Sequence, residues 1–253
     1  MAVVDPEAKL GDGNIIGPFC VIDKNVVIGD NNKFLNNVTV HFGARIGNGN
    51  EFFPGASIST KPQDLKFQGE ETTCEIGDNN SIRENVTISR GTASKGKTVV
   101  GNGNLLMENM HVAHDCVIGN GCIIGNSTKF AGEVVVDDFA IISATCLFHQ
   151  FIRVGSYVMF QGGSRTSMDI PPRHCWQGTH PLRWCQPRRS APQRIPPRDH
   201  RCHPRGLSHY LFPRCDERWR GHGSRTVPRF QGGGIYLLLH RELQARRYQI
   251  TDI

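Results

Sequence analysis

The chain has 253 residues, 38% of them hydrophobic, and a formal net charge of +6. It contains no apolar run long enough to cross a bilayer, and its N-terminus lacks the basic start and apolar stretch of a secretory signal, so we expect a cytoplasmic protein without a transmembrane segment. The net charge averages two unlike parts, because residues 1–180 carry 14 Lys and Arg against 18 Asp and Glu, whereas residues 181–253 carry 15 Arg against 5 acidic residues.

Apolar residues recur at every sixth position from Leu10 to Phe160. Of the 26 positions on this lattice, 23 are apolar, and the exceptions are Asp64, Glu70 and Ser94. A period of six differs from the 3.6 of a helix and the two of a strand, and it fits one short strand plus one corner, three of which make an 18-residue coil. One such unit cannot bury its own apolar residue, whereas stacked coils bury a continuous column. The sequence therefore predicts an all-β solenoid of parallel strands.

Other positions of the repeat carry characteristic residues. Asn is abundant at the corners, where it tolerates left-handed backbone, and glycine often follows the lattice residue directly, which suits tight turns and positive φ. Five cysteines share the slot four residues after a lattice position, and we interpret them as buried small residues, not as disulfides, metal ligands or a nucleophile. These cysteines are Cys20, Cys74, Cys116, Cys122 and Cys146. The glycines are Gly11, Gly17, Gly29, Gly47, Gly77, Gly101, Gly119, Gly125 and Gly155.

Two segments interrupt the repeat, at residues 59–75 and residues 90–98. The first contains Asp64 and Lys66, and the second has the sequence RGTASKGKT. Loops that leave a rigid scaffold often carry binding groups, so we expect the interruptions to mark a site. The alternative for each is a purely structural excursion.

Three histidines, His111, His114 and His149, avoid the inward positions and flank lattice residues of one predicted column. They are expected near one edge of the solenoid, within about 9–10 Å along its axis. Asp115 follows His114, so a base candidate has an orienting carboxylate beside it, and an imidazole suits general-base work at neutral pH. A solvated corner residue is the alternative for any one of these histidines.

Residues 181–253 do not continue the repeat; they contain no Lys or Asn and hold 8 of the 14 prolines. The prolines between Pro187 and Arg205 make helix formation there implausible, and we expect an irregular, largely disordered Arg/Pro-rich tail. Three interpretations compete: a basic arm for nucleic acid or anionic surfaces, a small Cys/His zinc module, or translation out of frame from about residues 174–185. We favour the third, because an out-of-frame GC-rich gene yields this composition, and we therefore expect no nucleic-acid partner.

The motifs PQDLKFQGE (62–70), HVAHDC (111–116) and HQFIRVGSYVMFQGGS (149–164) resemble the acyl-[acyl-carrier-protein]–UDP-N-acetylglucosamine O-acyltransferase family of lipid A biosynthesis. The resemblance covers about residues 2–181 and implies a left-handed parallel β-helix acyltransferase domain over residues 1–180. It also implies a homotrimer with active sites between subunits. The family transfers a 3-hydroxyacyl chain from the phosphopantetheine of acyl carrier protein to the 3-hydroxyl of UDP-N-acetylglucosamine, without a bound cofactor or metal.

The resemblance assigns roles to matching positions. His114 becomes the general base, Asp115 its orienting carboxylate, and the Gly132 N–H a donor to the developing oxyanion. No acyl-enzyme is expected. The positions that contact the sugar nucleotide or its surroundings are Asp64, Lys66, His111, His149 and Gln150, and those that line the pantetheine and acyl channel are Gly155, Gln161 and Gly162.

Three departures from the family pattern stand out. Glu133 and Ser89 occupy positions where the family has histidine, and residues 182–253 have no counterpart of the family's C-terminal helical region. Three other functions compete: a β-helix N-acyltransferase of the same pathway, a γ-type carbonic anhydrase with zinc between subunits, and a catalytically impaired scaffold without its native C-terminus.

Overall fold

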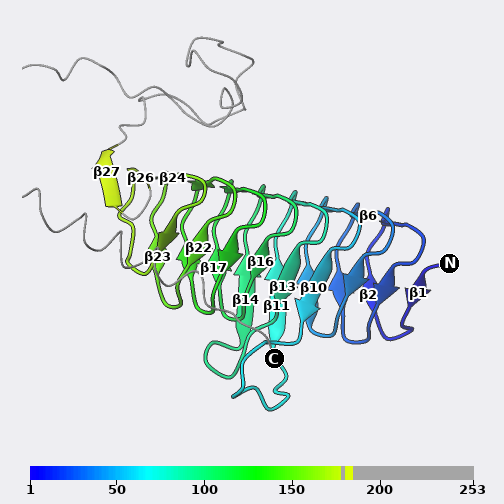
Figure 1. Ribbon diagram of the computed structural model, residues 1–253. Coiled ribbons are helices and arrows are strands. Elements are labelled where there is room, and N and C mark those ends of the chain that lie inside the picture. Colours follow the sequence, from blue (N-terminus) through cyan, green and yellow to red (C-terminus); the bar gives the residue numbers. More distant parts are fainter. Residues whose placement is uncertain (178–179, 185–253) are drawn as a thin grey trace, which may run out of the picture. The chain divides into compact units, whose positions relative to one another are not determined.

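The computed structural model describes residues 1–177 and 180–184, which form a stack of coils with three short strands each (Figure 1). The predicted all-β solenoid is confirmed: successive coils pair through parallel strands in three sheets. Of the expected irregular tail at residues 181–253, only residues 181–184 are described, and they continue a strand. The rest of that tail lies outside the described residues.

Each sheet collects one strand from every coil. The first sheet contains β1 (Val3–Val4), β4 (Val21–Ile22), β7 (Thr39–Val40), β10 (Ser57–Thr60), β13 (Thr87–Ser89), β16 (His111–Val112), β19 (Lys129–Phe130), β22 (Leu147–Phe148) and β25 (Arg165–Thr166). The second contains β2 (Lys9–Leu10), β5 (Val27–Ile28), β8 (Ala44–Ile46), β11 (Thr73–Ile76), β14 (Lys97–Val100), β17 (Val117–Ile118), β20 (Val135–Val136) and β23 (Arg153–Val154). The third contains β3 (Ile15–Ile16), β6 (Lys33–Phe34), β9 (Glu51–Phe52), β12 (Ser81–Ile82), β15 (Leu105–Leu106), β18 (Ile123–Ile124), β21 (Ile141–Ile142), β24 (Met159–Phe160), β26 (His174–Gln177) and β27 (His180–Trp184).

The solenoid ends in a different kind of pairing. β26 lies parallel to β24, as the repeat requires, but β27 returns antiparallel to β26.

Within residues 1–177 and 180–184, no helix is long and apolar enough to pass through a membrane.

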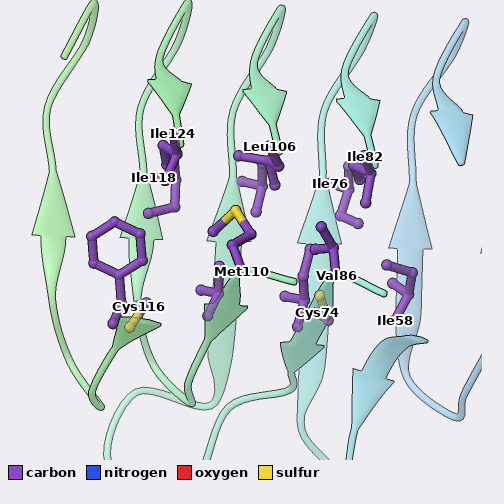
Figure 2. Close-up of a cluster of buried hydrophobic side chains, with 14 of the residues drawn as sticks. Ile58, Cys74, Ile76, Ile82, Val86, Leu106, Met110, Cys116, Ile118 and Ile124 are labelled. Carbon is purple, nitrogen blue, oxygen red and sulfur yellow. The ribbon is translucent and has the colours of Figure 1, made fainter. Parts of the chain in front are cut away.

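The lattice residues form the core. All apolar lattice residues from Ile22 to Phe160 are buried, whereas Leu10 is 40% exposed because the first coil has a neighbour on one side only. Figure 2 shows part of this core, where the lattice residues Ile82, Leu106 and Ile124 of successive coils lie next to one another. The rings of Phe34 and Phe52 in adjacent coils lie 4.6 Å apart and parallel. Each fully buried apolar side chain contributes about 1.5–3 kcal/mol, so the stack supplies the stability that no single coil has.

A ladder of asparagine side chains runs through one corner of the stack. The side-chain oxygen of each Asn accepts hydrogen bonds from the backbone and side-chain N–H groups of the Asn in the next coil, at 2.8–3.1 Å. Buried amides are therefore paired at every step, as burial of a polar group requires. The ladder consists of Asn14, Asn32, Asn50, Asn80 and Asn104 and ends at the backbone N–H of Cys122.

The prediction for glycine was wrong, and the prediction for asparagine was right. None of the nine glycines directly after lattice residues has positive φ; the left-handed position lies two residues further on, where Asn25, Asn31 and Asn37 have φ of 54–58°. The glycines are needed for close approach instead. A Cβ on Gly29, for instance, would lie 2.8 Å from the carbonyl oxygen of Gly47 in the next coil.

The five cysteines of the shared slot are buried free thiols, as predicted. Burial raises the pKa of the Cys74 and Cys116 thiols to about 12 and that of Cys122 to about 11, so these thiols stay protonated at neutral pH. Cys116 also donates a hydrogen bond to the Ala131 carbonyl at 3.1 Å. A thiol in this state is a poor nucleophile, in keeping with a small structural residue.

Both interruptions leave the stack at the same kind of corner, between the first sheet and the second. A long loop (residues 61–72) joins β10 to β11, and a short loop (residues 90–96) joins β13 to β14. Ile58 pairs with Ile88 and Ile76 with Val100, so these partners are 30 and 24 residues apart instead of the usual 18. The strands stay parallel, with a register shift between Ile58 and Thr60 where the long loop leaves β10. Figure 1 shows the two loops projecting from one edge of the solenoid near β11 and β14.

Candidate active site

The loops lie on the edge that also carries the predicted base. Residues 113–116 turn from β16 into β17, and residues 131–134 and 149–152 make the same turn one and two coils further on. The repeat therefore stacks Asp115, Glu133 and Phe151 at equivalent positions, and all three have φ near +60°. The corners after β16, β19 and β22, together with the two loops, form the candidate active site.

His114 is held by its neighbour in sequence. Its Nδ1 lies 2.8 Å from Oδ2 of Asp115, and the two side chains are 10% and 0% exposed. When Nδ1 donates its proton to the carboxylate, Nε2 is the nitrogen left to accept one. The contact with Asp115 therefore favours the tautomer that leaves Nε2 facing away from the carboxylate.

The short loop surrounds the Asp115 carboxylate with donors. Thr92 donates its backbone N–H to Oδ1 at 3.0 Å and its hydroxyl to Oδ2 at 2.6 Å, and the Lys95 N–H lies 3.3 Å from Oδ1. The Asp115 N–H itself donates to the hydroxyl of Thr98 at 2.8 Å. A fully buried carboxylate needs such partners, because an unpaired charge away from water is costly.

Gly132 packs against the imidazole from the next coil. A Cβ at this position would lie 2.5 Å from Cε1 and 2.6 Å from Nε2 of His114, and 3.0 Å from Nε2 of Gln150. Its N–H has no hydrogen-bond partner within the part of the chain that the structure describes. The residue that packs against the imidazole therefore also carries an unpaired backbone donor.

A hollow of about 470 Å³ opens over these groups. His111 lines it next to His114, and its Nδ1 lies 2.7 Å from the hydroxyl of Thr87. Burial, the positive charge of Lys129 and the nearby His114 lower the pKa of His111 below its ordinary value. The residues that line the hollow are Gln63, Ser89, His111, Ala113, His114, Lys129, Phe130, Ala131, Gly132, Leu147, Phe148 and Gln150.

Replacing Lys129 by methionine is expected to raise the pKa of His111. The ammonium group disfavours protonation of the imidazole, so its removal makes protonation easier, while burial keeps the pKa below its ordinary value. The neutral form of His111 favours folding, a contribution lost as the pH falls through the folded-state pKa. An NMR titration of the imidazole Cε1–H measures this pKa. The control is Lys33→Met, which removes an exposed lysine that pairs with Glu51 far from His111. It should leave the titration of His111 unchanged.

The long loop brings Asp64 to the same place. Asp64 Oδ2 lies 4.0 Å from Nε2 of His114, and its Oδ1 accepts the Lys66 N–H at 2.9 Å. Lys66 itself is exposed. The Arg90 guanidinium at the start of the short loop lies 5.2 Å from the Phe67 ring centroid, so the two loops contact each other.

The remaining sequence-predicted residues lie apart from this hollow. His149 is exposed and lines a neighbouring hollow of about 450 Å³, together with Arg165 and Met168. Gly155 follows the second sheet, and Gln161–Gly162 follows the third, so they occupy other edges of this chain. Within one chain the structure does not bring these glycines and Gln161 to His114.

Two positions that depart from the family pattern have new partners. Glu133 accepts a hydrogen bond from the Ser94 hydroxyl at 3.0 Å and lies 3.5 Å from Lys95 Nζ. Ser89 is buried, with its hydroxyl 3.1 Å from that of Thr60, and lines the hollow.

Sequence reasoning missed Thr92 and Lys129 as parts of the site. Lys129 directly precedes the lattice residue Phe130, so it stands on the outer face of β19 beside His111. The six-residue repeat could have predicted that Lys129 lies beside His111. It could not have predicted the position of Thr92, which lies in a loop outside the repeat. Within residues 1–177 and 180–184, no three His, Cys, Asp or Glu side chains gather as metal ligands would.

Comparison with known proteins points to one group of enzymes. The family model described as bacterial transferase hexapeptide (six repeats) matches residues 7–42 and 97–132. The crystal structure of LpxA, a UDP-N-acetylglucosamine acyltransferase from Bacteroides fragilis, is 67% identical, with 69% of this chain and 68% of that chain covered and a TM-score of 0.68. UDP-N-acetylglucosamine acyltransferase from Francisella novicida is 42% identical over 72% of this chain and 68% of that one, with a TM-score of 0.70. LpxA from Acinetobacter baumannii is 40% identical over 72% and 71%, also with a TM-score of 0.70.

Proposed function

Because the chain belongs to the UDP-N-acetylglucosamine acyltransferase (LpxA) family, which carries out the first step of lipid A biosynthesis, we propose that the edge around His114 is its active site. There a 3-hydroxyacyl chain passes from acyl carrier protein to the 3-hydroxyl of UDP-N-acetylglucosamine. The observation that carries this proposal is the geometry of one imidazole: Nδ1 lies 2.8 Å from Asp115 Oδ2, and Gly132, whose N–H is unpaired among the described residues, packs against the Cε1–Nε2 edge of the ring.

His114, Asp115 and Gly132 each have a separate role in the proposed reaction. His114 Nε2 takes the proton from the sugar hydroxyl as that oxygen attacks the thioester carbonyl carbon, and Asp115 stabilises the imidazolium that forms. Negative charge develops on the carbonyl oxygen, where the Gly132 N–H donates to it. The intermediate collapses with cleavage of the C–S bond, and the departing thiolate receives the proton from His114. No cysteine is acylated, in keeping with the raised pKa of Cys116.

The cationic and polar lining of the hollow supports a sugar-nucleotide ligand. Lys129 and His111 lie on its wall, and Gln63 of the long loop closes one side. Asp64 and Lys66 reach toward the same ligand from the long loop, Gln150 from the corner after β22, and His149 from the adjoining hollow.

A homotrimer completes the site in this proposal. Gly155, Gln161 and Gly162 lie on other edges, so they line a pantetheine and acyl channel only if a second copy places its edge against the His114 corner. Exposed apolar side chains on this face support such a contact: Leu147 and Met168, which line the two hollows, are 50% and 56% exposed. The acyl chain remains bound to the phosphopantetheine of acyl carrier protein until its transfer to the sugar. The protein acts in the cytoplasm.

The test is acyl transfer by the full chain. Purified protein is incubated with 3-hydroxyacyl-acyl carrier protein and UDP-N-acetylglucosamine, and the O-acylated sugar nucleotide is followed by mass spectrometry. Light scattering on the same sample gives the oligomeric state. Product formation in a trimeric sample supports the proposal; a folded protein that forms no product with any acyl chain length would refute it.

A further inference from the structure

Glu133 touches both the catalytic corner and the short loop. Its backbone N–H donates to the His114 carbonyl at 3.0 Å, while its carboxylate accepts the Ser94 hydroxyl at 3.0 Å and lies 3.5 Å from Lys95 Nζ. The carboxylate is 18% exposed and does not line the hollow. Its side chain therefore acts on the loop and not on a ligand in the hollow.

The residues that Glu133 holds include one of the Asp115 donors, Lys95, and its neighbour Ser94. Thr92 and Lys95 supply the two backbone N–H groups and Thr92 the hydroxyl that surround the Asp115 carboxylate. The loop is also closed on itself, because the Gly96 N–H donates to the Thr92 carbonyl at 2.7 Å. Its base is fixed to the first residue of β11, because the Gly91 N–H donates to the Thr73 carbonyl. Its tip, residues 94–95, is held by the Glu133 carboxylate two coils beyond β13, in addition to the Lys95 N–H contact with Asp115.

From these contacts we infer that Glu133 is a positioning residue for the acyl-transfer reaction: it fastens the short loop over Asp115 and so fixes the orientation of His114. The inference rests on the proposed function for its kinetic consequence. The contact chain runs from Glu133 to Ser94 and Lys95, through the loop backbone to Asp115, and from Asp115 Oδ2 to His114 Nδ1. A shift of about 1 Å at a catalytic group can cost on the order of 100-fold in rate. Loss of the Glu133 contacts, which lie two contacts from His114, is therefore expected to lower kcat.

Glu133→Ala is expected to lower kcat by roughly tenfold and to leave KM for both substrates unchanged. The φ of 62° at this position is non-ideal for Glu and Ala alike, so the substitution removes the anchor without a new backbone cost. Glu133→Gln keeps an acceptor for the Ser94 hydroxyl and should recover part of the loss. Glu51→Ala removes the exposed Lys33–Glu51 ion pair in another coil and is the matched control, with kcat unchanged.

A double-mutant cycle separates positioning from an independent effect. If Glu133 acts through Asp115, adding Glu133→Ala to Asp115→Asn should change kcat no further, because the group being positioned is already lost. A full tenfold additional loss in the double variant, a change in KM alone, or an unchanged kcat in Glu133→Ala would each overturn the inference.

Hydrogen exchange tests the anchor without any turnover. Peptides spanning residues 90–97 should exchange roughly tenfold faster in Glu133→Ala than in wild type, since without its anchor the loop opens more often and the Thr92 and Lys95 amides separate from Asp115 Oδ1. Glu51→Ala should match wild type. Unchanged exchange in a protein of unchanged Tm would overturn the inference even if the enzyme is active. If wild type shows no acyl transfer but the loop loosens as expected, the proposed function fails while the anchoring role stands.

Discussion

Replacing His114 by alanine should reduce acyl transfer by about 10²–10⁴-fold, the range that a general base contributes. The alanine removes Nε2, the nitrogen that takes the proton; the Asp64 carboxylate of the long loop, 4.0 Å from Nε2, is not an imidazole held on Asp115 and should not replace it. Stability should fall by only about 1 kcal/mol, because Asp115 keeps its donors from Thr92 and Lys95. Initial rates with saturating UDP-N-acetylglucosamine, together with a thermal melt, measure both effects.

His41 offers a matched control for this variant. It also has a carboxylate partner, Asp23, at 3.3 Å, and a hydroxyl neighbour, Ser57, at 3.1 Å, but it lies outside the hollow. His41→Ala should therefore retain the wild-type rate. Undiminished turnover in His114→Ala would remove the base assignment, whatever the control shows.

Gly132→Ala should lower kcat by about 100-fold, with a smaller effect on KM. The φ of Gly132 lies outside the left-handed region, so alanine fits the backbone, but its Cβ would lie 2.5 Å from Cε1 and 2.6 Å from Nε2 of His114. Such contacts force the imidazole away from its place on Asp115, and a displacement of about 1 Å costs on the order of 100-fold in rate. Steady-state kinetics of the folded variant give kcat and KM separately.

The control for Gly132→Ala is a glycine whose replacement strains the backbone and nothing else. Gly103 has a φ of +64° and open space around a built Cβ. Gly103→Ala should cost about 1–2 kcal/mol of stability and leave kcat intact. Equal kcat in Gly132→Ala and wild type would mean that the His114 ring does not occupy the position described here during catalysis.

The core could be predicted from the sequence because a stack of coils is nearly one-dimensional. Away from the two interruptions, each apolar residue meets its counterpart 18 positions away, so the arithmetic that placed Val112 and Phe130 in one column needed no knowledge of distant contacts. The same arithmetic indicates that Gly155 and Gly162 follow other sheets than His114 does. A match to family motifs identifies residues that belong to one active site, but it does not tell whether they come from the same copy of the chain or from two copies.

The surroundings of Asp115 could not be predicted in this way. Thr92 reaches the carboxylate from a loop that departs from the repeat, and no periodicity fixes where such a loop returns its hydroxyl. The glycine interpretation failed for a related reason: propensity suggested positive φ, whereas the distance between coils, as at Gly29 and Gly47, decided the residue. Pairwise spacing between coils is a tertiary quantity, and a single-residue preference does not contain it.

The long and short loops leave and re-enter the stack at one corner while the strands beneath them stay parallel and the lattice residues stay paired, as Ile58 with Ile88 and Ile76 with Val100. Such a loop needs no particular length, since the coil closes below it. Insertions and deletions at this corner therefore alter the reach of Asp64 or the cover over Asp115 without touching a single buried residue of the columns. Changes in the length of these two loops can therefore alter ligand preference without destabilising the fold. Enzymes whose active-site loops also form part of the core cannot change in this way.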